Sequence, residues 1–160
     1  MIIFLNGPIN AGKTTVAKIL VKKLSSTALV EIDVLREMIE WMAIDEAISI
    51  NLENAVSVIR NLSKRGLNVI VPYPLSEKNY EYIMNGLQDL GTKLYFFTLA
   101  PKLEKTLTNR GTRELDEWEY ERIKHHYNIG IHKPSFGEII DNTNQTPEET
   151  ARLILNKINM

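Results

Sequence analysis

A glycine-containing run of the form G-x-x-x-x-G-K-[ST] restricts the fold of this chain more than any other feature; it reads Gly7-Pro8-Ile9-Asn10-Ala11-Gly12-Lys13-Thr14. The run follows the apolar residues 2–5, which predict a buried strand, and leads into residues 13–24, where apolar residues recur at helical spacing. Glycines let successive backbone N–H groups point at phosphate oxygens, and the new helix adds the positive end of its dipole. A strand, such a loop and a helix in succession predict a phosphate-binding unit.

The fixed positions of this motif each have a chemical role. Lys13 brings a mobile cation to the β- and γ-phosphates, and the hydroxyl of Thr14 is a ligand for Mg²⁺, which also holds phosphate oxygens. We therefore expect a nucleoside triphosphate, ATP with Mg²⁺, to bind at this loop. The residues expected to contact the nucleotide are Gly7, Asn10, Ala11, Gly12, Lys13, Thr14 and Thr15.

The rest of the chain alternates short apolar runs with longer amphipathic stretches, which predicts βα units and a parallel sheet. Further strands are expected at 28–32, 67–71, 93–99 and 138–141, and further helices at about 34–41, 48–65, 77–90, 102–109, 116–127 and beyond 146. Asp116 followed by Glu119 has the spacing of a capping box, and Thr146 precedes a proline and two glutamates. The predicted fold class is α/β, a three-layer sandwich with five strands.

Length and charge fit one globular domain with no nucleic-acid or membrane partner. The 160 residues match the size of one domain, and a hydrophobic content of 44% suffices for a core. A formal net charge of −1 provides no field for nucleic acid or an anionic membrane. No apolar stretch reaches the roughly 18 residues of a bilayer span. The chain has no cysteine, which suits a reducing compartment, and we expect a cytoplasmic protein.

An acidic pair stands at the end of the second predicted strand. Ligands bind at the carboxyl ends of strands in open α/β sheets, and alternation along an extended segment puts Glu31 and Asp33 on one side. Arg36 lies three residues after Asp33 and shares a helical face with it. Asp33 suits acceptance of a hydroxyl proton, Arg36 suits an acceptor or a moving phosphate, and Glu31 suits a water in the Mg²⁺ shell. The simpler alternative is that Asp33 caps the next helix and Arg36 is solvated.

Arg110 and Arg113 flank a glycine after the helix that follows the fourth predicted strand. A loop that carries arginines can close over a nucleotide, exclude water and neutralise charge in the transition state. A charged, exposed turn is the alternative interpretation.

The remaining aromatic and histidine residues have less specific interpretations. Four further residues suit either an acceptor pocket or the core, namely Trp41, Met42, Tyr73 and Trp118. The spacing of the histidines is not that of a metal site with carboxylates, so they are interpreted as structural or solvated. They are His125, His126 and His132.

Together these residues resemble those of the small P-loop kinases, such as shikimate kinase, gluconate kinase, the zeta-toxin kinases and chloramphenicol phosphotransferase. The shared features are an N-terminal glycine loop, an acidic residue after strand two and a late arginine lid. The nearest resemblance is to the tunicamycin-resistance ATP-binding proteins. Their Ile-Val-Pro and Phe-Thr-Leu runs appear here as Ile70-Val71-Pro72 and Phe97-Thr98-Leu99.

The resemblance implies one P-loop kinase-like domain over residues 1–160, a parallel sheet of order 2-3-1-4-5 and a short lid near 110–116. It implies that Arg110 packs on adenine and that Arg113 reaches a phosphate. It also implies that Asn142 and Thr143, in the turn after strand five, cradle the adenine edge.

Two features depart from the pattern of these kinases. Pro72-Tyr73-Pro74 stands where shikimate kinases carry a glycine cluster, which argues against shikimate as the acceptor. No clear Walker B aspartate ends strand three, so Glu31 or water is expected to serve the metal.

The expected function is an ATP-dependent kinase that transfers the γ-phosphate to a hydroxyl group of a small molecule. Its expected catalytic residues are Lys13, Asp33, Arg36 and Arg113. The alternative is a nucleotide-dependent protein that binds or sequesters an antibiotic without phosphotransfer. A kinase acting on nucleic-acid ends is disfavoured by the near-neutral charge.

Overall fold

The structure is a computed structural model that describes residues 1–109 and 114–158. In these ranges no helix is both long and apolar enough to cross a membrane. The elements are β1 (Ile2–Asn6), α1 (Lys13–Lys23), β2 (Thr27–Leu29), α2 (Ile32–Arg36), η1 (Glu37–Ile39), α3 (Ile44–Lys64), β3 (Asn68–Pro72), α4 (Glu77–Leu87), η2 (Gln88–Leu90), β4 (Leu94–Leu99), α5 (Leu103–Thr106), α6 (Glu117–Asn128), β5 (Glu138–Ile140) and α7 (Pro147–Ile158).

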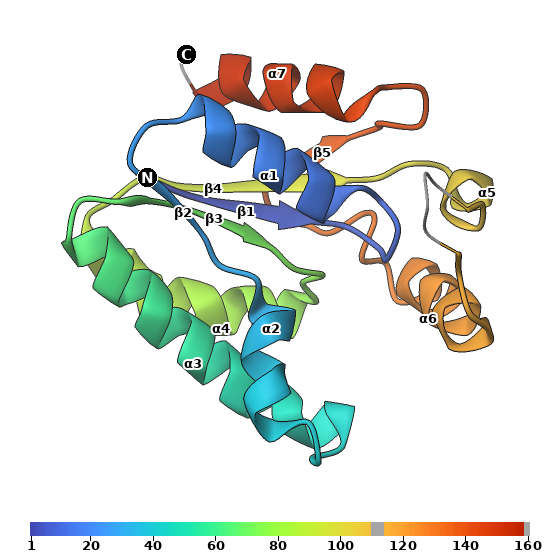
Figure 1. Ribbon diagram of the computed structural model, residues 1–160, viewed down its shortest axis with the longest axis horizontal. Coiled ribbons are helices and arrows are strands. Elements are labelled where there is room, and N and C mark those ends of the chain that lie inside the picture. The colour runs from blue at the N-terminus through green and yellow to red at the C-terminus, as the bar shows by residue number, and fades with distance from the viewer. Residues whose placement is uncertain (110–113, 159–160) are drawn as a thin grey trace.

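The strands form one parallel sheet in the order β2-β3-β1-β4-β5, which confirms the predicted fold class and strand order. β1 is the central strand, and Ile3 lies between Ile70 of β3 and Tyr95 of β4. Helices α1 and α7 cover one face of the sheet, and α2, α3 and α4 lie against the other (Figure 1). Because both faces are covered, β1 is buried throughout, and its first four residues are a continuous apolar run that ends at Asn6.

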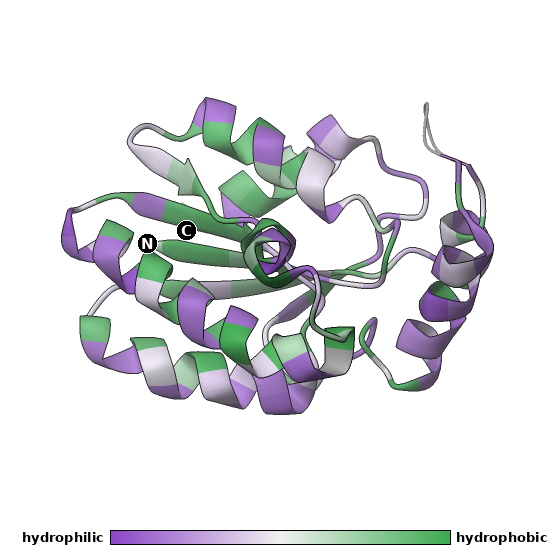
Figure 2. Cartoon of the chain, turned by 60° about the horizontal axis from the view of Figure 1, so that its bottom comes forward, coloured by the Kyte–Doolittle hydropathy of each residue, from purple (hydrophilic) through white to green (hydrophobic). Residues whose placement is uncertain are grey.

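Alternation along β1 divides the core into two layers. Phe4 packs toward α3 and α4 with Ile59 and Ile83. Leu5 packs toward α1 and α7 with residues such as Leu20. In Figure 2 the central strands are largely hydrophobic, whereas hydrophilic and hydrophobic residues alternate along the helices. The two layers hold the sheet rigidly, so the carboxyl ends of its strands form a fixed edge on which loops can position side chains.

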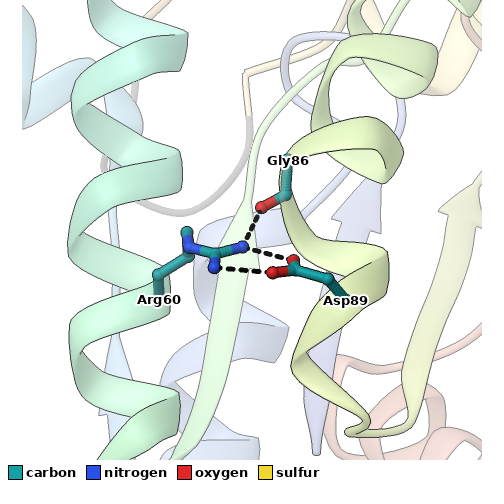
Figure 3. A network of polar contacts seen from close by, with 3 residues as sticks. All are labelled: Arg60, Gly86 and Asp89. Carbon is teal, nitrogen blue, oxygen red and sulfur yellow. Dashed lines mark hydrogen bonds and ion pairs between the residues drawn. The ribbon is translucent and has the colours of Figure 1, made fainter.

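A polar contact joins the two long helices on the α3 side of the sheet. Arg60 of α3 donates from Nη1 to the carbonyl oxygen of Gly86, at 2.6 Å, and from Nη2 to Oδ2 of Asp89, at 2.8 Å (Figure 3). The helices approach closely here, because a Cβ added at Gly86 would lie 2.8 Å from Cγ1 of Val56. Glycine at this position therefore lets α3 and α4 pack as one unit.

The structure corrects the predicted boundaries around the acidic pair. β2 ends at Leu29, and α2 begins at Ile32, inside the range predicted as strand. The side chain of Ile32 is fully buried in the α3-side core, which turns the chain into a helix at the sheet edge. Asp33 therefore lies in the first turn of α2, and the prediction that Glu31 and Asp33 share one side of an extended segment was wrong.

The other boundaries agree more closely with the prediction. α3 begins at Ile44, four residues before the predicted start, since the N–H of Ala47 already bonds to the carbonyl of Ala43. The capping box of Asp116 and Glu119 is present at α6. At α7, Thr146 and Glu149 exchange the same pair of bonds, because each backbone N–H donates to the other residue's side chain.

Candidate functional site

The loop between β1 and α1 has a backbone that glycine alone accepts at its two ends. Gly7 has a φ of 137°, and a Cβ there would lie 2.3 Å from the carbonyl oxygen of Leu99. Gly12, at the start of α1, has a φ of 95°. Asn10 also adopts a positive φ, 61°, in the left-handed region that asparagine tolerates better than most residues. These conformations produce the curled loop that the sequence motif predicts.

Side chains from distant segments hold this loop in place. The amide Nδ2 of Asn10 donates to the carbonyls of Thr106, at 2.8 Å, and Thr108, at 3.0 Å. The amide Nδ2 of Asn142 donates to the carbonyl of Ala11, at 3.0 Å, and Asn142 is almost fully buried. The loop is thereby attached to α5 on one side and to the turn after β5 on the other.

Lys13 extends over the mouth of the loop. Its Nζ donates to the carbonyls of Gly7, at 2.9 Å, and Pro8, at 2.7 Å. Thr14 and Thr15 are exposed in the first turn of α1, which carries no acidic residue. The positive end of the helix dipole and the ammonium group therefore face the same space, which favours an anion such as phosphate.

A cavity of about 740 Å³ opens in front of the loop, at the carboxyl edge of the sheet. The sequence-predicted residues that line it are Asn10, Gly12, Lys13, Thr14, Thr15, Asp33 and Arg36. The structure thus brings the phosphate loop and the first residues of α2 together in one space. Glu31 is not among the lining residues, although its charge acts on Asp33.

Asp33 has an unusual electrostatic position in this cavity. Burial of the carboxyl group raises its pKa, the charges of Lys13 and Arg36 lower it, and the charge of Glu31 raises it again, so that the pKa lies above the usual value. A raised pKa makes the carboxylate a better proton acceptor. Within the described part of the chain, the buried Nε of Arg36 has no hydrogen-bond partner, which leaves a donor beside this carboxylate.

Tyr73 lies in the wall of the cavity, directly after β3. It is buried, and burial together with the negative charge of Asp33 raises its pKa to about 12. The phenol therefore keeps its proton and remains a hydrogen-bond donor. Trp41, for which the sequence allowed either a pocket or a core position, is 82% exposed. It lines neither this cavity nor the smaller one beside it.

Sequence reasoning found only part of the wall that α6 forms, because it left Trp118 open between an acceptor pocket and the core and missed Arg122 and His126. Trp118, Arg122 and His126 are spaced by four residues and line the cavity from one stripe of this helix. The interpretation of the histidines as merely structural or solvated omitted that His126 borders the site. A four-residue spacing of an aromatic, a cationic and a histidine side chain was the signal that could have identified this face.

His126 also contacts the phosphate loop directly. Its Nδ1 accepts the backbone N–H of Ile9 at 3.3 Å. Burial, followed by the charges of Lys13 and Arg122, lowers its pKa to about 4. The imidazole is therefore neutral near pH 7, and with Nδ1 acting as an acceptor the ring proton resides on Nε2.

Asn6 connects the loop to the far side of the site. This fully buried residue ends β1, immediately before Gly7. Its Nδ2 donates to Oγ1 of Thr98 at 3.0 Å and to the carbonyl of Ile131 at 3.3 Å, and its Oδ1 accepts the N–H of Leu75 at 2.7 Å. Three segments around the cavity are thus tied to one amide.

The predicted lid arginines, Arg110 and Arg113, lie outside the described residues. The described residues on either side of them are close together, because Oδ1 of Asn109 accepts the N–H of Leu115 at 3.2 Å. In the turn after β5, Oγ1 of Thr143 accepts the N–H of Lys102 at 2.9 Å. Contact of Asn142 and Thr143 with an adenine edge stays a prediction.

A divalent metal at this site would take only some of its ligands from the protein and the others from phosphate and water. Among the described residues, no group of three or more His, Asp or Glu side chains is arranged to hold a metal ion. Thr14 and Asp33 line the same cavity, and Glu31 is near enough to influence Asp33. A few oxygen donors beside a phosphate site fit Mg²⁺, which keeps several waters and takes the rest of its shell from the nucleotide.

Comparison with known proteins identifies the fold. No protein-family model and no curated protein matches this sequence. The tunicamycin resistance protein of Deinococcus radiodurans superposes with a TM-score of 0.74 at 21% identity, over 99% of this chain and 95% of that chain. The APS kinase of Mycobacterium tuberculosis, in complex with AMPPNP and APS, has a TM-score of 0.74 at 17% identity, over 99% and 97%.

Shikimate kinase from Acinetobacter baumannii, in complex with shikimate, has a TM-score of 0.65 at 18% identity, over 99% of this chain and 92% of that chain. The chain therefore has the α/β fold of the small P-loop kinases, as the resemblance implied. The structure of the tunicamycin resistance protein, the particular resemblance found in the sequence, shares this fold over nearly the whole chain. At these identities the likeness establishes the fold, and the chemistry has to be argued from the site.

Proposed function

We propose that this protein is an ATP-dependent kinase that transfers the γ-phosphate of ATP to a hydroxyl group of a small molecule. The observation that carries the proposal is the position of Asp33. It lines the same cavity as Lys13 and Thr14, and the charge of Lys13 acts on its pKa. A carboxylate of raised pKa beside a phosphate-binding lysine suits removal of the proton from an attacking hydroxyl.

The chemistry can be assigned to the residues of this chain. The N–H groups of the loop and the ammonium of Lys13 bind the phosphates. Thr14 and, through water, Glu31 would hold a Mg²⁺ ion, which would offset the negative charge of the phosphates. The acceptor oxygen forms a bond to the γ-phosphorus, the bond to the bridging oxygen of ADP breaks, and Asp33 takes the hydroxyl proton. Arg36 stabilises the charge on the transferred group.

The lid completes the proposed site. In a single domain over residues 1–160, a lid near 110–116 closes over the nucleotide, with Arg110 on the adenine and Arg113 at a phosphate. Asn142 and Thr143 contact the adenine edge. The APS kinase structure, which contains AMPPNP and APS, and the shikimate kinase structure, which contains shikimate, support a nucleotide and a small acceptor in this fold.

The test of this proposal is a phosphotransfer screen across sugars, aminoglycosides, nucleoside antibiotics and hydroxy acids, with mass analysis of each acceptor. We expect Asp33→Asn to bind ATP normally and to lower kcat by about 10²–10⁴-fold. We expect Lys13→Ala to lower both ATP affinity and turnover. Normal turnover by either variant would refute the assigned roles.

A second candidate function is nucleotide-dependent binding of an antibiotic without phosphotransfer. The structural similarity to the tunicamycin resistance protein favours it. It predicts ATP binding with no phosphorylated product for any acceptor, and unchanged antibiotic binding by Asp33→Asn. Product formation in the screen would exclude it.

A further inference from the structure

A second cavity of about 420 Å³ adjoins the first on the side of α3 and α4. Five residues line both cavities, namely Ile48, Tyr73, Pro74, Arg122 and His126. One ligand can therefore extend past these residues from the phosphate loop into the second space. We call this second space the apolar chamber.

The walls of the apolar chamber are mainly hydrophobic. Leu52 of α3 and Ile131, after α6, form buried parts of the wall and are each 4% exposed. Tyr82 of α4 and Ile129 also line the chamber, and they are 45% and 53% exposed. Large apolar side chains that remain exposed around a cavity lose contact with water when a ligand binds, which favours an apolar ligand group.

The charged groups of the chamber are positive. Lys78 and Arg122 line it, and none of the described lining side chains is a carboxylate. Glu77 precedes Lys78, but its two carboxylate oxygens accept the N–H of Ser135, at 2.8 Å, and its hydroxyl, at 2.9 Å. Asp33 and Glu119 line only the first cavity. A cationic ligand would find no counter-ion in the chamber, whereas an anion would find two.

We propose that the apolar chamber binds the hydrocarbon ring of the phosphate acceptor, and that this acceptor is a hydroxy acid with an apolar ring. This inference rests on the proposed kinase function and names its substrate class. The ring occupies the space between Leu52 and Ile129, and the carboxylate lies near Arg122, where the two cavities meet. The hydroxyl group then extends toward Asp33.

The test uses four small probes that differ in one group each, with the full-length protein and AMPPNP so that no turnover occurs. Phenyllactate carries a ring, a hydroxyl and a carboxylate; lactate lacks the ring. 1-Amino-3-phenyl-2-propanol has an aminomethyl group in place of the carboxylate and is positively charged there, and 3-phenyl-1,2-propanediol is neutral there. We expect phenyllactate to bind about tenfold or more tighter than lactate and the amino alcohol, with the diol between them, as measured by calorimetry.

Two variants locate the binding. Ile129→Glu puts a carboxylate in the chamber at an exposed position that the fold tolerates, and we expect it to weaken phenyllactate binding about tenfold and to reduce the preference over 1-amino-3-phenyl-2-propanol. Ile139→Glu is the matched control, because Ile139 is 51% exposed on β5 and lines neither cavity. Equal phenyllactate affinity of the two variants, or of phenyllactate and lactate, would overturn the inference.

Failure of the substrate class and failure of the kinase function give different results. Phosphorylation of sugars or aminoglycosides at rates that Ile129→Glu leaves unchanged would overturn the class while the kinase stands. If the probes bind in the predicted order but the phosphotransfer screen with ATP yields no phosphorylated product, the result would support the chamber as a binding site and contradict the kinase function.

Discussion

The two cavities at the carboxyl edge of the sheet are built in different ways. The phosphate loop is one continuous segment between β1 and α1, and it offers a ligand backbone N–H groups and the first residues of a helix. The apolar chamber takes side chains from α3, α4, α6 and the loops between them. A site made of backbone conformation recognises a general group such as phosphate, whereas a site made of scattered side chains can specialise for one acceptor.

This contrast predicts that backbone changes affect the loop most. Gly7→Ala places a Cβ 2.3 Å from the carbonyl oxygen of Leu99, so the loop has to move. We expect kcat/KM for ATP to fall about 100-fold or more, because small displacements of a catalytic loop have effects of that size. Phenyllactate binding should change little.

The control for this prediction is Gly66→Ala. Gly66 also has a positive φ, 79°, but nothing lies within 4 Å of an added Cβ. Its substitution should cost about 1 kcal/mol of stability through backbone strain alone, with normal ATP kinetics. Equal loss of ATP kinetics in both variants would contradict the role of the Leu99 contact.

Asn6 precedes the phosphate loop and bonds to Leu75 and to Ile131, a residue of the chamber wall, so its substitution tests whether the two cavities are independent. Asn6→Ala removes bonds to Thr98, Leu75 and Ile131 and leaves buried backbone groups unpaired. We expect a loss of about 3–5 kcal/mol in the free energy of unfolding, together with weaker binding of both ATP and phenyllactate. Urea denaturation and calorimetry measure these effects.

The matched control is Asn68→Ala. Asn68 is half-buried at the start of β3, and its amide Nδ2 donates to Ser25 at 3.1 Å. It lines neither cavity, so we expect a loss of about 1 kcal/mol and unchanged ligand affinities. If Asn6→Ala impaired ATP binding alone, the two cavities would not be coupled through this amide.

His126, which lines both cavities, makes the stability of the folded protein depend on pH. The unfolded chain binds a proton at this residue near pH 6.5, but the folded protein does not until about pH 4. The unfolded state therefore binds more protons in this interval, so stability falls as pH drops from about 6.5 to about 4. Over this pH interval, protonation of His126 lowers the free energy of unfolding by about 3 kcal/mol.

Urea denaturation at several pH values between 4 and 7.5 measures this dependence. His126→Gln should flatten the profile, whereas His125→Gln, at the exposed neighbouring position, should leave it as in the wild type. A profile that His126→Gln does not alter would mean that another group causes the loss of stability in acid.

The sequence predicts features that depend on local patterns better than features that depend on the packing of distant segments. The loop, the strand order and the capping boxes depend on local patterns or on a recognisable family, and all were predicted. The extended segment through Asp33 was wrong because burial of Ile32 at the sheet edge starts a helix there. Arg122 and His126 were missed because only packing of α6 brings them to the loop, and spacing along one helix does not name the surface it faces.

The smallest predicted effect concerns the contact that joins the helices behind the chamber. Asp89→Asn removes the charge opposite Arg60, whose side chain is 27% exposed while that of Asp89 is 62% exposed (Figure 3). Because exposed ion pairs contribute little, and Arg60 keeps its bond to Gly86 at 2.6 Å, we expect only a small decrease in the urea concentration at the unfolding midpoint.

This variant distinguishes a rigid chamber from an adaptable one. α3 and α4 supply much of the chamber wall, whereas neither helix contributes to the phosphate loop. Asp89→Asn should therefore leave ATP affinity unchanged, and any change in ligand affinity should appear with phenyllactate, by about twofold or less. A larger change for ATP than for phenyllactate would contradict the division of the site, since the loop would then depend on this contact more than the chamber wall does.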